Sequence, residues 1–295
     1  MKEPLFLGAA TAIVTPFFEG QLDLAALDRI LEQQLAAKID AIVVCGTTGE
    51  AATLSGEEHT KVIDFTVKKV RGRIPVIAGT GSNDTQFAVE LSKEAKALGV
   101  DGLLLVTPYY NKTSQRGLIA SFNHIANSVK MPCILYNVPS RTGVNILPET
   151  YGELAKNPYI VATKEANYDI SALAKTMHYC GDNLTVYCGE DVQTLAIVAM
   201  GGKGVISVLS NVLPREMHEL TAAALENRMD DARARTLQYV ELMNALFMDV
   251  NPIPVKAALN MMGFNCGHCR LPLTDMSEAQ LESLRAVLSK HVKLA

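Results

Sequence analysis

The chain has 295 residues, of which 48% are hydrophobic and 20% are charged, and it contains no tryptophan. This length suits an α/β barrel of about 250 residues with an appendage. The net charge of −4 supplies no basic surface, so we expect neither nucleic acid nor a membrane as a partner. No signal-peptide pattern and no apolar run of membrane-spanning length is present, so we expect a cytoplasmic protein.

Cysteine usage also favours a reducing compartment. Four of the six cysteines lie in or beside apolar runs, as buried small side chains do: Cys45, Cys133, Cys180 and Cys188. Cys266 and Cys269 form a Cys-x-x-Cys pair, but they follow a helical segment and lack the strand and helix that flank a redox motif. No second pair accompanies them to bind zinc. We therefore favour neither a redox nor a metal-binding role for this pair.

Eight short apolar runs follow one another along the chain, and each is typical of a strand that is buried on both faces. They cover residues 9–14, 41–45, 75–78, 102–106, 133–136, 160–163, 184–188 and 204–208. Between them lie amphipathic patterns typical of helices. In the first of these, Leu24, Leu27, Leu31 and Leu35 share one face, and the second begins with a capping box at Ser55 and Glu58.

A helical pattern separates each neighbouring pair of runs, which predicts parallel strands joined by right-handed crossovers. Eight such units close most naturally into a (β/α)8 TIM barrel, and an open doubly wound sheet is the alternative. After residue 227 the strand pattern stops, and residues 242–247, 255–262 and 281–292 show only helical patterns. We therefore predict a catalytic barrel over residues 1–227 and a C-terminal helical appendage over residues 228–295.

Lys164 ends the sixth predicted strand, directly after the apolar run 159–163. A charged ammonium group is costly in such a place unless it is paired or used. Burial lowers the pKa of lysines, and a neutral lysine amine can attack a carbonyl carbon to form a Schiff base. A lysine that is merely ion-paired, or that extends its amine to water, is the structural alternative. The neighbouring strand ends decide between the two interpretations.

The other predicted strand ends are rich in polar residues, and in a barrel of this kind they meet at one face. Residues 46–50 read Gly-Thr-Thr-Gly-Glu, residues 107–111 read Thr-Pro-Tyr-Tyr-Asn, and residues 136–143 read Tyr-Asn-Val-Pro-Ser-Arg-Thr-Gly. Each motif alone has a structural explanation as a turn or a packing contact. Adjacent parallel strands lie about 4.8 Å apart, however, so Tyr136 and Lys164 can touch. A tyrosine beside the lysine can transfer the protons that Schiff-base chemistry requires.

Together with Lys-Glu-Ala at residues 164–166, these motifs resemble the dihydrodipicolinate synthase family, and the resemblance covers about residues 10–272. That family belongs to the pyruvate-dependent class I aldolases, which also include N-acetylneuraminate lyases and keto-deoxy-gluconate aldolases. The barrel, lysine and tyrosine are common to all of these enzymes. Two features favour the synthases: Thr47-Thr48, where the lyases usually carry Ser-Thr, and Arg141, whose planar guanidinium suits a carboxylate.

The resemblance implies a set of catalytic residues. Lys164 would form a Schiff base with pyruvate, and Tyr136 would relay protons together with Thr48 and with Tyr110 of a neighbouring subunit. The resulting enamine would attack L-aspartate 4-semialdehyde, and the substrate's own amine would release the cyclic product by transimination. The resemblance also implies a homotetramer built as a dimer of dimers, with no metal or other cofactor.

Further residues are assigned to substrate binding by the same resemblance. Thr47 and Thr48 would hold the carboxylate of pyruvate, and backbone carbonyls near Gly189 and Ile206 would line the pocket. Arg141 would bind the carboxylate of the aldehyde.

One part of the family pattern is missing. Members that lysine inhibits carry a histidine and a glutamate where this chain has Gly56 and Phe87. The other residues of that allosteric site remain as a possible remnant: Ala52, His59, Asn83 and Tyr109. Because Phe87 removes an anionic partner for a cationic effector, we expect weak or absent inhibition by lysine.

Three other functions remain as alternatives. The second substrate could be a sugar acid, as in the lyases and sugar-acid aldolases. A metal-dependent aldolase could use Glu50, Glu190 and Asp191, although the six histidines are scattered without ligand spacing. A catalytically silent barrel could bind a keto acid without turnover, but binding alone does not need an imine-forming lysine beside a tyrosine.

Overall fold

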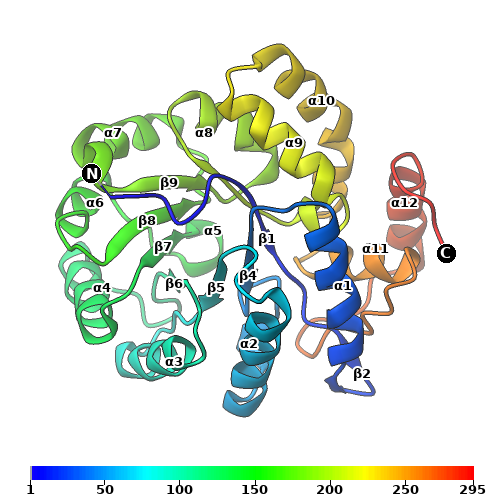
Figure 1. Cartoon of the computed structure of the whole chain (residues 1–295), viewed down its shortest axis with the longest axis horizontal. Coiled ribbons are helices and arrows are strands. Elements are labelled where there is room, and N and C mark those ends of the chain that lie inside the picture. The colour runs from blue at the N-terminus through cyan, green and yellow to red at the C-terminus, as the bar shows by residue number, and fades with distance from the viewer. Residues whose placement is uncertain (1) are drawn as a thin grey trace.

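The structure is a computed structural model that describes residues 2–295. Eight parallel strands form a closed barrel in the order β1-β10-β9-β8-β7-β6-β5-β4, and helices surround it (Figure 1). The barrel strands are β1 Gly8–Ala12, β4 Ala41–Val44, β5 Val76–Gly79, β6 Gly102–Val106, β7 Cys133–Asn137, β8 Ile160–Glu165, β9 Thr185–Cys188 and β10 Gly204–Ser207. Each strand end lies within two residues of its predicted place. The predicted (β/α)8 barrel is confirmed.

The strands are buried on both faces, which explains their continuous apolar sequences. Alternate residues fill the barrel interior, including Ala10, Val43 and Leu104, and the residues between them pack outward against the helices. The surrounding helices are α1 Leu24–Ala36, α2 Gly56–Val70, α3 Thr85–Ala97, α4 Gln115–Val129, α5 Pro139–Thr142, α6 Pro148–Leu154, α7 Ile170–Cys180, α8 Thr194–Ala199 and α9 Pro214–Leu225. In the described part of the chain, no helix is long and apolar enough to cross a membrane.

The capping box places the start of α2 where the sequence predicts it. At the start of α2, the Glu58 backbone N–H donates to Ser55 Oγ at 3.2 Å, and the Ser55 N–H donates to Glu58 Oε2 at 2.9 Å, so the capping box is confirmed. Leu27 and Leu31 of α1 are buried against the barrel. A short hairpin, β2 Phe17–Phe18 and β3 Gln21–Leu22, was not predicted, because its strands are too short for a periodic pattern.

Three C-terminal helices follow the barrel: α10 Met229–Ala245, α11 Ile253–Met261 and α12 Glu278–Leu288. In Figure 1 they lie on one side of the barrel, where α10 packs against α9 and α12 packs against α10 and α11. The predicted helical appendage is confirmed. The division into residues 1–227 and 228–295 stays a prediction, and its boundary falls in the turn between α9 and α10.

A buried ion pair joins the appendage to the barrel. Lys256 Nζ of α11 lies 2.8 Å from Glu50 Oε1 in the loop after β4, and the two residues are only 1% and 4% exposed. The backbone N–H of Arg270 donates to the other carboxylate oxygen, Glu50 Oε2, at 2.8 Å. The guanidinium of Arg270 also binds both carboxylate oxygens of Glu58. The loop that carries Thr47 and Thr48 is therefore anchored by C-terminal residues.

Candidate active site

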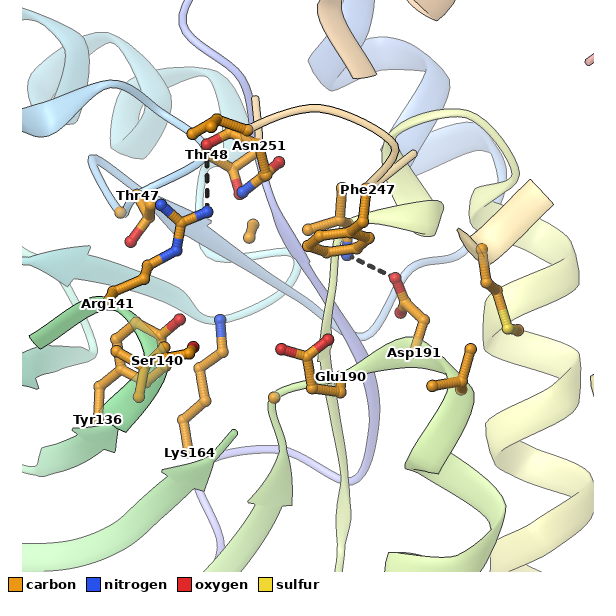
Figure 2. Close-up of a pocket in the computed structure, with 18 of the residues that line it drawn as sticks. Thr47, Thr48, Tyr136, Ser140, Arg141, Lys164, Glu190, Asp191, Phe247 and Asn251 are labelled. Carbon is orange, nitrogen blue, oxygen red and sulfur yellow. Dashed lines mark hydrogen bonds between the residues drawn. The ribbon is translucent and has the colours of Figure 1, made fainter. Parts of the chain in front are cut away.

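A cavity of about 310 Å³ lies at the C-terminal ends of the barrel strands. Its walls come from strand ends, from the loops that follow them and from the segment between α10 and α11. The polar and aromatic residues that line it are Thr47, Thr48, Tyr136, Ser140, Arg141, Lys164, Tyr168, Glu190, Asp191, Asn244, Phe247, Asp249 and Asn251. Figure 2 shows most of these side chains around the cavity.

Lys164 and Tyr136 face each other across the junction of two neighbouring strands. They are direct partners in the register of β7 and β8, and Lys164 Nζ lies 4.4 Å from the centre of the Tyr136 ring. Both residues are buried, and both point into the cavity. A lysine amine can attack a carbonyl carbon, and a neighbouring phenol can exchange the protons that this chemistry requires.

Arg141 and Thr48 are linked by a residue of the appendage. Thr48 is buried, and its Oγ1 accepts a hydrogen bond of 3.0 Å from Asn251 Nδ2. Arg141 Nη2 donates to the backbone oxygen of Asn251 at 3.3 Å (Figure 2). Arg141 belongs to the short helix α5, which begins with Pro139 at its first position. Sequence reasoning missed Asn251, because nothing in the local sequence sets this asparagine apart.

Two carboxylates line the other side of the cavity. Burial raises the pKa of Glu190, and the neighbouring Asp191 raises it further, whereas the charge of Lys164 opposes the rise. Burial also raises the pKa of Asp191, although its Oδ2 accepts backbone hydrogen bonds from Val208 at 3.1 Å and Leu209 at 2.8 Å. The carboxylates near Lys164 are thus Glu190 and Asp191, and burial partly shields both of them from water.

Most residues that the sequence analysis proposed for the site meet in this one cavity: Thr47, Thr48, Tyr136, Arg141, Lys164 and Gly189. Ile206 does not line it, and its side chain packs in the barrel interior instead. Tyr110 does not line it either. This residue is 92% exposed, in the loop after β6, and its backbone has a φ of 65°.

The proposed allosteric remnant lies outside the cavity. His59 is buried in α2, with Nε2 2.8 Å from the backbone oxygen of Gly79, and burial lowers its pKa. The backbone oxygen of Asn83 accepts a hydrogen bond of 2.8 Å from Asn111 Nδ2. Tyr109 is partly exposed, and Ala52 lies in a short 3-10 turn before α2.

The residues considered for metal or redox chemistry do not gather at one place, although Glu190 and Asp191 both line the cavity. Glu50 does not line the cavity, and both of its carboxylate oxygens are bound by Lys256 and Arg270. Within residues 2–295, no group of three or more His, Cys, Asp or Glu side chains is placed to hold a metal ion. Burial raises the pKa of both Cys266 and Cys269 to about 12, so these free thiols stay protonated at neutral pH.

Comparisons with known proteins identify the family of the chain. Residues 5–291 match the sequence model of the Dihydrodipicolinate synthetase family. The 4-hydroxy-tetrahydrodipicolinate synthase of Acetivibrio thermocellus is 50% identical over 291 residues, which are 99% of each chain. The crystal structure of dihydrodipicolinate synthase from Aquifex aeolicus superposes with a TM-score of 0.95 at 47% identity, covering 97% of this chain and 98% of the other.

A solved monomeric variant of dihydrodipicolinate synthase is also similar, with a TM-score of 0.94 and 43% identity over 97% of each chain. The family match and the alignments with these relatives cover nearly the whole sequence. The chain belongs to the dihydrodipicolinate synthetase family.

Proposed function

We propose that this chain is a 4-hydroxy-tetrahydrodipicolinate synthase, a lyase that condenses pyruvate with L-aspartate 4-semialdehyde in the synthesis of diaminopimelate and lysine. Relatives about 50% identical over almost the full length carry this name. The observation that carries the proposal is the contact between Lys164 and Tyr136 in a cavity that also holds Arg141. The free cysteines fit a reducing cytoplasm, where we place the enzyme.

The first half of the reaction uses Lys164 as a nucleophile. Its neutral amine attacks the keto carbon of pyruvate, and the keto oxygen leaves as water when the imine forms. Tyr136 supplies and removes the protons for these steps, a role that its position beside the Lys164 amine supports. Thr47 and Thr48 hold the pyruvate carboxylate, and the hydrogen bond from Asn251 to Thr48 Oγ1 leaves the Thr48 hydroxyl proton free to point into the cavity.

The second half joins the two substrates. Loss of a proton from the pyruvate methyl group gives an enamine, whose carbon attacks the aldehyde carbon of the second substrate. The amine of that substrate then attacks the imine carbon, closes the ring and releases the amine of Lys164. Arg141 binds the aldehyde's carboxylate through its planar guanidinium. The sum of the steps is the loss of one water per product molecule.

We also propose that the active enzyme is a homotetramer arranged as a dimer of dimers. Tyr110 supports an assembly of this kind, because a tyrosine that is 92% exposed beside the mouth of the barrel is suited to pack into a neighbouring subunit. In the assembly, Tyr110 of one subunit would extend the proton relay of Tyr136 and Thr48 in the next.

Comparative kinetics test the proposed function. The purified chain is assayed for kcat/KM with pyruvate and L-aspartate 4-semialdehyde, and in parallel for cleavage of N-acetylneuraminate and keto-deoxy-gluconate. We expect a strong preference for the semialdehyde. Preferred cleavage of a sugar acid would contradict the proposed substrate while retaining the Schiff-base mechanism.

A further inference from the structure

A second polar cluster lies directly behind the reactive pair, on the outer face of the same strands. Asn137 follows Tyr136 on β7 and Glu165 follows Lys164 on β8, and the two following residues are partners in the strand register. Successive strand residues point to opposite faces, so these side chains turn away from the cavity, and neither lines it. Both are buried, and Asn137 Nδ2 donates to Glu165 Oε1 at 2.9 Å.

The Glu165 carboxylate accepts two more hydrogen bonds. The backbone N–H of Asn167 donates to Oε1 at 3.0 Å, and the hydroxyl of Tyr151 in α6 donates to Oε2 at 3.0 Å. The Tyr151 oxygen in turn accepts a hydrogen bond of 3.0 Å from Thr163 Oγ1. The carboxylate therefore ties the end of β8 to β7, to the loop that follows β8 and to a surrounding helix.

Asn137 extends the cluster to the segment that follows Arg141 in the chain. Its Nδ2 also donates to Asn145 Oδ1 at 2.8 Å, and its Oδ1 accepts from the backbone N–H of Ile146 at 3.1 Å. Every hydrogen-bonding group of the Asn137 amide is thus occupied. The strand ends that carry Tyr136 and Lys164 are held by the same network as the segment that follows α5.

Placing a carboxylate here is costly for the fold. Burial raises the pKa of Glu165 to about 7, even though all three hydrogen bonds favour its charged form. Apolar side chains in place of the whole cluster would avoid that cost, and replacing a complete set of buried charged partners by packed apolar residues is often neutral or stabilising. A costly polar cluster directly behind a reactive pair is expected where the geometry of that pair must be fixed closely.

We infer that Glu165, with Asn137 as its partner, is a positioning residue that holds the Lys164 amine and the Tyr136 hydroxyl in the geometry needed for imine formation. This inference rests on the proposed function of Lys164. Glu165 does not line the cavity, so it would act only through the two strand ends. Misplacement of reacting groups by about 1 Å can slow a reaction by about 100-fold.

The test uses Glu165→Leu, which keeps a similar volume but removes every acceptor. Glu153→Leu is the matched control, because Glu153 is an exposed glutamate of α6 that binds only Lys156. Imine formation with pyruvate is timed by quenching with borohydride, and the rate is divided by the fraction of folded protein. We expect imine formation to slow by about 10- to 100-fold in Glu165→Leu and to be unchanged in the control. Glu165→Gln, which keeps the Oε1 acceptor but loses the Oε2 acceptor for Tyr151, should recover part of the rate.

A purely structural role predicts a different result. In that case Glu165→Leu would lower the melting temperature but form the imine at the wild-type rate per folded molecule, which would overturn the positioning role. If Glu165→Leu does not fold, Tyr151→Phe removes one donor from the carboxylate and should still slow imine formation several-fold, and an unchanged rate there would equally overturn it. Failure of the wild-type chain to trap pyruvate at all would instead overturn the proposed function.

Discussion

Lys164 Nζ lies 4.4 Å from the centre of the Tyr136 ring, and the two residues are direct partners across β7 and β8. Removing the phenolic hydroxyl in Tyr136→Phe should lower kcat by about 100-fold or more, the usual scale of general acid–base catalysis. The KM for pyruvate should change much less. Tyr159→Phe is the control, because Tyr159 does not line the cavity. The kcat of each protein is measured by steady-state kinetics at saturating aldehyde. If Tyr136→Phe kept the kcat of the wild type, the proposed proton relay would be excluded.

Arg141 lies in the cavity as the proposed partner of the aldehyde's carboxylate. Arg141→Ala should weaken aldehyde capture by about 1.5–3 kcal/mol, the range of a charge-assisted hydrogen bond, which corresponds to about 10- to 160-fold in kcat/KM. Borohydride trapping of pyruvate on Lys164 should remain. Arg116→Ala, at an exposed position of α4, provides the control. An unchanged kcat/KM for the aldehyde would remove Arg141 from its assigned role.

Lysine should inhibit this enzyme weakly or not at all. Phe87 is 47% exposed on α3 and offers no charge to a cationic effector. At Gly56 an added Cβ would meet no atom within 4 Å, so the position has room for the histidine of the inhibited relatives. The double variant Gly56→His with Phe87→Glu should therefore gain inhibition. Assays across a lysine titration compare the two proteins, and sub-millimolar inhibition of the wild type would contradict this prediction.

The buried pair between Lys256 and Glu50 should be important for stability. Lys256→Met leaves the Glu50 carboxylate buried without its cation, which should lower the free energy of unfolding by about 3–5 kcal/mol. Lys290→Met removes a pair that is exposed, with Glu241, and should cost less than about 1 kcal/mol. Denaturant unfolding of the two variants tests this difference. Equal losses of stability would contradict it.

The pH dependence of stability should reveal the pair between Glu58 and Arg270. Hydrogen bonds from Arg270, together with smaller contributions from Ser55, lower the pKa of Glu58 from its ordinary value of 4.5 to about 2. A lowered folded-state pKa adds stability above the unfolded value, and this stability is lost as the pH falls through the folded value. The stability difference between wild type and Glu58→Gln should thus be constant above about pH 5 and shrink toward about pH 2. The free energy of unfolding of both proteins is measured across this pH range. A difference that did not shrink at low pH would contradict the lowered pKa of Glu58.

The barrel could be predicted from the sequence because its strands are buried on both faces. Runs such as residues 41–45 and 102–106 have no polar alternation, and helical patterns separate them, so both the strand type and the parallel order follow. The reactive pair was predictable for the same reason. Lys164 and Tyr136 end neighbouring strands, and the spacing of strands in a sheet brings such ends together.

Other parts of the site depend on contacts between distant segments. Asn251 reaches Thr48 across 203 residues of sequence, and no local pattern encodes that approach. Tyr151 and Glu165 belong to elements whose sequences indicate only a helix and a strand, so their hydrogen bond becomes visible only in the fold. The family resemblance implied that backbone carbonyls near Ile206 line the pocket, whereas the residue of this segment that lines the cavity is Val208, two residues further along the chain.

The most direct test of the central claim is to reduce the wild-type chain with borohydride in the presence of pyruvate and to map the modified peptide by mass spectrometry. We predict a single reduced pyruvate adduct, located on Lys164 and absent when pyruvate is omitted. No adduct, or an adduct on a different lysine, would contradict the Schiff-base mechanism and the function proposed from it.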